Sequence, residues 1–200
     1  MSNVLTIDNI DAVNRNGEHR MRLLSRGLTW VFTALLGFIA LTVLTGLVVS
    51  LFFPAYVEIG PNGGELELQP FTPATLDHGM TWLAALSLST RLAGIADIVI
   101  MSVPLALVVF NLRGLFRLYA AGIVFANENA QHLKRIGLWL IAYPFAKFGA
   151  NMLFQLFGGP DRAWFSSTLL FALLLGAIVV VIAQVMEMGH AIERERAEFV

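Results

Sequence analysis

Two ionisable residues, Asp97 and Lys147, stand inside long apolar stretches of the sequence. Charge in the hydrocarbon core of a membrane is costly, so such residues usually face the interior of a helix bundle and pair with one another. If the two stretches are antiparallel helices, the depths of the residues differ by roughly 7–8 Å, which a lysine side chain largely covers. We therefore predict a buried Asp97–Lys147 ion pair. In the functional interpretation, the pair is a proton or ion relay or it anchors a ligand. In the structural interpretation, it fixes the two helices to one another.

Histidines offer two weaker candidate sites. Glu187 and His190 have the i, i+3 spacing that occurs twice in carboxylate di-iron bundles, but here the motif occurs once, and two further buried glutamates are missing. A solvated helix end is the simpler interpretation. His132 lies at the same predicted side of the membrane, and a His132–His190 pair would titrate near neutral pH. The sequence also has no cysteine, phosphate loop or nucleophile elbow, so we expect no enzymatic activity, metal or cofactor.

The composition indicates which elements must position these residues. Hydrophobic residues make up 57% of the chain and charged residues 14%, whereas soluble domains have roughly 45–50% and about 25%. Four apolar stretches are each long enough to cross roughly 30 Å of hydrocarbon. The predicted spans are about residues 28–53, 92–110, 136–157 and 166–186. We therefore predict one all-α domain over residues 1–200, a four-transmembrane-helix bundle that contacts the lipid bilayer.

Basic residues are distributed unevenly between the segments outside these spans. The N-terminal segment, the segment between spans two and three, and the tail together hold ten Lys or Arg. On the other side, residues 54–80 hold none and residues 158–165 hold one, and Arg91 and Lys147 belong to neither group. The positive-inside rule then places both termini in the cytoplasm. The net charge of −1 argues against direct nucleic-acid binding.

The outer loop contains alternating residues on either side of a Pro-Asn-Gly-Gly turn, over residues 56–68. This pattern predicts a short β-hairpin, either a solvated hairpin or a lip for a cation or ligand. Residues 81–90 are compatible with a helix that lies on the membrane surface or extends the second span. On the inner side, residues 112–120 continue the second span, Gly122 ends it, and Asn127 caps an inner amphipathic helix.

The inner segment resembles a bacterial membrane-protein family catalogued as domain of unknown function 2975. Residues 122–129 match its motif G-x-[IV]-F-[S/T]-x-E-N, and its next positions, L-x-x-I-[AG], match Leu133, Ile136 and Gly137. The tail matches a second family pattern through Gly189, Glu195 and Val200. One position departs: Ala126 stands where relatives carry Ser or Thr, so Asn127 is expected to replace that cap.

The resemblance implies a multi-pass protein of the bacterial inner membrane. Relatives are often encoded beside a small helix-turn-helix repressor, which implies a sensing or repressor-tethering role for the cytoplasmic loop and tail. The predicted partner-binding residues are Phe125, Glu128, Asn129, Leu133, Arg135, Glu187, Gly189 and Glu195.

Two other functions stay open from the sequence. A small ion or solute transporter would use Asp97 and Lys147, and an accessory subunit would belong to a larger membrane complex. Stripes of small residues, such as Ala172 with Gly176, suit packing within the bundle or a homo-oligomer contact.

Overall fold

The protein is described by a computed structural model covering residues 7–54, 58–59, 81–82, 86–123, 126–159 and 164–198. Side chains are described for residues 22–54, 86–123, 126–159 and 164–189. The elements in chain order are α1 (Ile7–Phe52), β1 (Glu58–Ile59), β2 (Thr81–Trp82), α2 (Leu88–Ala120), α3 (Asn127–Leu156) and α4 (Ser167–Glu198).

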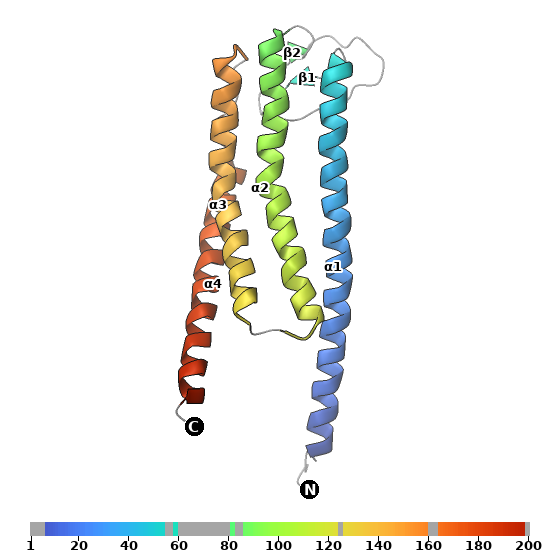
Figure 1. The fold of residues 1–200 in the computed structure, drawn as a ribbon, viewed down its shortest axis with the longest axis vertical. Helices are drawn as coiled ribbons and strands as arrows, with labels where there is room; N and C mark the ends of the chain where they lie inside the picture. The colour runs from blue at the N-terminus through green and yellow to red at the C-terminus, as the bar shows by residue number, and fades with distance from the viewer. Residues whose placement is uncertain are drawn as a thin grey trace.

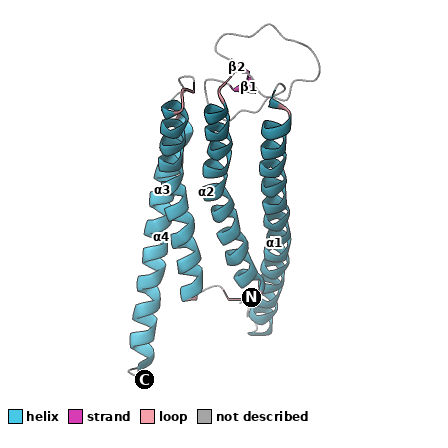
Figure 2. Cartoon of the chain, turned by 45° about the horizontal axis from the view of Figure 1, so that its top comes forward, coloured by secondary structure: helices cyan, strands magenta, loops and turns pink. Residues whose placement is uncertain are grey.

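The four long helices run up and down in chain order, so α1 and α3 point one way and α2 and α4 the other (Figure 1). The main contacts join helices that follow one another in the chain: α1 with α2, α2 with α3, and α3 with α4. The chain therefore forms a succession of antiparallel helix pairs. The two short strands lie at the end opposite the termini (Figure 2).

Three helices are long and apolar enough to cross a membrane, over Arg22–Phe52, Leu88–Ala120 and Ser167–Gly189. They expose large apolar side chains, among them Phe38 on α1 and Phe171 on α4, as expected for helices surrounded by lipid. α3 is not one of the three. It is a single helix in which the predicted inner amphipathic helix and the predicted third span are continuous.

The interior between α2 and α3 is unusually polar. Seven of the eight buried residues of α2, all except Val109, recur at spacings of three, four or seven: Thr90, Ala93, Asp97, Pro104, Val108, Asn111 and Leu115. This is the spacing of one helix face. Apolar packing gathers toward the two ends of the helix pair, with Ala93 against Phe154 at one end and Val108, Leu115 and Ile136 at the other.

Glycines end both α2 and α3. Gly122 has φ 83° and Gly158 has φ 78°, the left-handed conformation that glycine adopts without a steric penalty. In each turn the next amide donates to a carbonyl five residues back, from Ile123 to Leu118 and from Gly159 to Phe154, both at 3.0 Å. These are Schellman motifs, which satisfy the last carbonyls of a helix. The prediction that Gly122 ends the helix is confirmed.

The outer segment differs from its prediction. β1 pairs antiparallel with β2, with Glu58 opposite Trp82 and Ile59 opposite Thr81. The hairpin predicted over residues 56–68 would instead pair β1 with residues that follow the turn at 61–64, and those residues lie outside the described part. The prediction that a helix includes residues 81–82 is wrong. α2 begins instead at Leu88, because the Ser87 hydroxyl accepts a hydrogen bond from the Thr90 amide (3.2 Å) and acts as the N-cap.

Candidate functional site

The family motif of residues 122–129 lies where the chain passes from α2 to α3. Asn129 is completely buried, and its side-chain Nδ2 donates to the carbonyl of Ile123 (2.9 Å). Leu133 packs against the cluster of Val108, Leu115 and Ile136. Two of the predicted partner-binding residues, Asn129 and Leu133, therefore hold this end of the helix pair together.

The start of α3 differs from the expected cap. Ala126 occupies the N-cap position and makes no side-chain hydrogen bond, and Asn127 is the first helical residue. The prediction that Asn127 replaces the missing hydroxyl cap is therefore wrong. Glu128 lies exposed in the first turn, where its negative charge interacts favourably with the helix dipole. Phe125 lies outside the described residues.

His132 forms the polar contact between α2 and α3 at this end. Its Nδ1 lies 3.1 Å from Oδ1 of Asn111. The ring packs on Gly114, where a Cβ atom would lie only 2.6 Å from His132 Cε1. Burial lowers the pKa of His132, the positive charges of Arg135 and Arg117 lower it further, and Glu128 opposes them. The neutral imidazole is therefore the form that fits this contact.

The contact predicts a pH dependence of stability. Because the pKa of His132 is lowered in the folded protein, its contribution is complete above the ordinary value of about 6.5 and is lost as the pH falls below it. We expect the thermal stability in detergent to fall between about pH 7 and pH 5.5. In His132→Gln, which keeps a polar side chain but does not titrate, this fall should be smaller. An equal fall in both proteins would contradict the assignment.

A salt bridge joins α3 to α4 at the same end. Lys134 Nζ lies 3.4 Å from Glu187 Oε2, and the two side chains are 43% and 32% exposed. Such an exposed pair contributes about 0–1 kcal/mol. Gly189 is exposed, with open space around the position of a Cβ atom. The side chains of His190 and Glu195 lie outside the described residues, and within the described part no three metal-binding side chains cluster.

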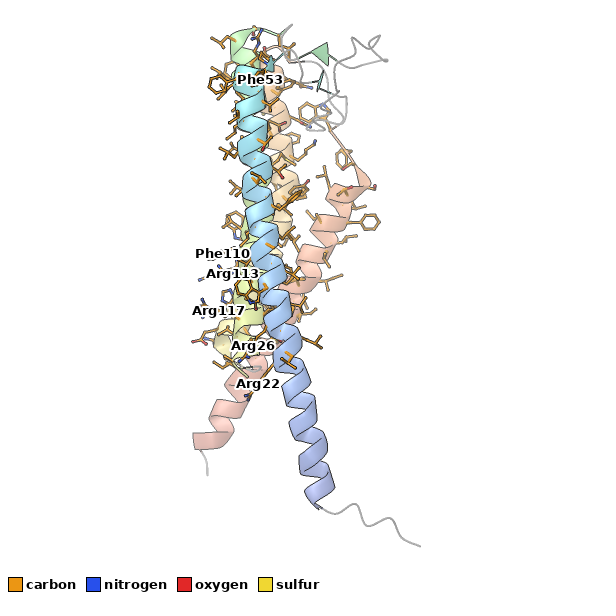
Figure 3. All side chains as sticks on the ribbon, turned by 90° about the vertical axis from the view of Figure 1, so that its right-hand side faces the viewer. Arg22, Arg26, Phe53, Phe110, Arg113 and Arg117 are labelled. Carbon is orange, nitrogen blue, oxygen red and sulfur yellow. The ribbon has the colours of Figure 1, made fainter. Side chains whose placement is uncertain are left out.

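Arginines from α1 and α2 gather at this end of the molecule. Figure 3 shows Arg22 and Arg26 on α1 near Arg113 and Arg117 on α2. The guanidinium of Arg22 reaches the turn after α2, since a Cβ atom on Gly122 would lie 3.0 Å from Arg22 Nη2. We call the end formed by this turn, the start of α3 and these arginines the arginine-rich end.

The register of the α2–α3 interface places Asp97 close to the level of Lys147, so the depth difference of roughly 7–8 Å expected from the sequence is too large. Asp97 is only 4% exposed, and Lys147 is partly buried. The Thr90 hydroxyl donates to the carbonyl of Phe157 at one end of the interface, and Asn111 contacts His132 at the other. Asp97 is seven residues from Thr90 and fourteen from Asn111, so equal steps along α3 place it opposite residues 146–150. A bond between Asp97 and Lys147 stays a prediction, now supported by the register.

The three long apolar helices, with their exposed apolar side chains, indicate a predominantly helical protein of the multi-pass membrane type. A family model described as "Protein of unknown function (DUF2975)" matches residues 71–200, which contain α2, α3 and α4. The chain belongs to this family. No curated protein and no solved structure matches it.

Proposed function

We propose that the chain is a non-enzymatic, four-span membrane protein that binds a protein partner at its arginine-rich end, on the cytoplasmic side. The observation that carries the proposal is the shape of this end. α1 and α4 both continue as helices beyond the turn between α2 and α3 (Figure 1), so two helical segments extend past the part of the molecule that suits a membrane.

The direction of the helices supports a fourth crossing by α3. α2 and α4 run the same way (Figure 1), so a chain that crosses in both must return between them. α3 has 30 residues, about 45 Å in length, which is enough for that return. His132 contacts α2 and Lys134 contacts α4, whereas large apolar side chains are exposed along the rest of α3. The strongly exposed apolar residues of α3 are Leu138, Phe145, Phe148, Met152 and Leu156.

The arrangement of charge supports a cytoplasmic arginine-rich end. Arg22, Arg26, Arg113 and Arg117 lie together there (Figure 3), and the positive-inside rule assigns such an end to the cytoplasm. In this orientation the N-terminal part of α1 and the C-terminal part of α4 also lie on the cytoplasmic side. The family resemblance favours a bacterial inner membrane.

The projecting segments are suited to a protein partner. α1 begins at Ile7, well before the first apolar stretch begins at about residue 28. α4 ends at Glu198, beyond the end of the last apolar stretch at about residue 186. Both projecting sequences mix acidic and basic residues, a pattern that favours solvated helices able to pair with another protein. The family resemblance favours a small helix-turn-helix regulator as this partner.

Affinity isolation from cross-linked cells tests the proposal. The full chain should recover a DNA-binding regulator encoded beside it, and a chain that ends at residue 189 should reach the membrane in equal amount but lose that regulator. The matched control is Ser166→Arg at the opposite end, which should keep it. Recovery of the protein alone, or equal recovery with the shortened chain, would contradict the proposal.

The position of Asp97 favours a second candidate function. A carboxylate that is 4% exposed, level with a lysine on the neighbouring helix, is typical of ion and proton paths in membranes. A transporter of this kind should show ion or proton flux when reconstituted in liposomes, and Asp97→Asn should reduce that flux. Flux that is absent, or unchanged in the variant, would count against this function.

A further inference from the structure

A groove with a volume of about 480 Å³ opens on the side of the molecule between α2 and α3. Leu107, Phe110 and Asn111 line it from α2, and Arg135, Leu138 and Trp139 from α3. Phe110 and Leu138 are 54% and 52% exposed. Trp139 also packs on the cluster of Val108, Leu115 and Ile136, and this contact fixes one wall of the groove.

Charge and apolar surface occupy different ends of the groove. Arg135 precedes Leu138 and Trp139 by about one helical turn, so it lies on the same face of α3 but nearer the arginine-rich end. The Asn111 side chain is engaged within the protein, because its Nδ2 donates to Leu107 (2.8 Å) and its Oδ1 faces His132. Arg135 therefore supplies the charge of the groove.

A second arginine strengthens the positive potential at this end. The positive charges of Arg135 and Arg117 both lower the pKa of His132, so both contribute to the potential at this end. Arg117 is exposed on α2, beyond the groove residues toward the arginine-rich end. The groove thus begins in apolar surface at membrane depth and ends in positive charge.

We infer that this groove binds one anionic phospholipid, with an acyl chain along Leu107, Phe110 and Leu138 and the phosphate against Arg135. An amphipathic groove that ends in basic residues fits a lipid with a negatively charged headgroup, and such basic pockets between membrane helices are known lipid sites. A peptide would have to reach apolar side chains within the span-like part of α2, whereas a lipid is already there. The inference needs the chain to lie in a membrane, but it does not depend on the protein partner.

Quenching of Trp139 fluorescence by brominated lipid tests this site. The full chain keeps Trp139, and its three other tryptophans are replaced by phenylalanine. It is reconstituted in phosphatidylcholine vesicles that contain a small fraction of either dibrominated phosphatidylglycerol or dibrominated phosphatidylcholine. We expect the brominated anionic lipid to quench Trp139 more strongly. Arg135→Gln should weaken that preference about ten-fold, the effect of losing one direct hydrogen bond between charged groups.

Arg26→Gln is the matched control, because it removes the same charge at the arginine-rich end but does not line the groove. It should keep the preference. Arg135 is exposed, so its substitution should leave the helical circular dichroism unchanged. Equal quenching by the two lipids in the parent protein would overturn the site. Equal loss of preference in both arginine variants would also overturn it, since it would show attraction to the surface as a whole. If the affinity isolation recovers no regulator, the proposed protein partner is contradicted, but the lipid site is not.

Discussion

Gly137→Leu should lower the free energy of unfolding by about 3 kcal/mol, the upper part of the range for overpacked interiors. At Gly137 the backbones of α3 and α4 touch. A Cβ atom there would lie 2.8 Å from the carbonyl oxygen of Gly176 and 2.9 Å from the amide nitrogen of Val180. These are backbone atoms, so a larger side chain cannot be accommodated by a rotamer change, and α4 must move away from α3.

Gly149→Leu on the same helix is the control. Nothing lies within 4 Å of a Cβ atom at Gly149, so this substitution should be neutral or slightly stabilising, because leucine favours a helix by about 0.8 kcal/mol over glycine. Unfolding by increasing fractions of sodium dodecyl sulfate in mixed micelles compares the two variants with the parent. Equal stability of the two variants would contradict the close contact between α3 and α4.

The predicted Asp97–Lys147 pair implies that Asp97→Leu lowers the free energy of unfolding by about 3 kcal/mol, because the charge of Lys147 would then lack the counter-charge assigned to it. The double variant Asp97→Leu with Lys147→Met should recover most of this loss, since both charges are then replaced by apolar side chains of similar size. Replacement of a whole buried pair is often close to neutral.

The same unfolding titration, applied to both single variants and the double variant, measures the coupling between Asp97 and Lys147. A double variant that loses the sum of the two single losses would show that the residues are independent. Ser166→Leu, at an exposed position outside the helices, is the control for adding an apolar side chain.

The sequence predicts the long helices well because their apolar stretches are long and nearly free of charge. Each of α1, α2 and α4 contains almost all of one predicted span and extends beyond it. The turn at Gly122 follows from the need for a residue that tolerates positive φ. α3 is harder to assign from composition. Lys134, Arg135 and Lys147 reduce its mean apolarity, although large apolar side chains are exposed along the helix. Only the packing partners show on which side the polar groups lie.

Contacts between distant residues account for what the sequence could not predict. β1 pairs with a strand more than twenty residues away, and no local turn signal specifies that partner. The contact of Gly114 with His132 joins two separate helices, and so does the contact of Gly137 with Gly176. Gly137 is part of the family motif, but the sequence could not show that it is the point where two helices touch. The Ala172 and Gly176 stripe could have suggested this through its small residues.

In the proposed topology, α3 crosses the membrane and the arginine-rich end lies in the cytoplasm. The chain has no cysteine, so single cysteines can be introduced without background. Ala121→Cys lies in the turn after α2 and Ser166→Cys just before α4, and both positions are exposed. In intact spheroplasts, a membrane-impermeant maleimide should label Ser166→Cys at once, and Ala121→Cys only after the membrane is permeabilised. Labelling of both cysteines from the same side would contradict this topology.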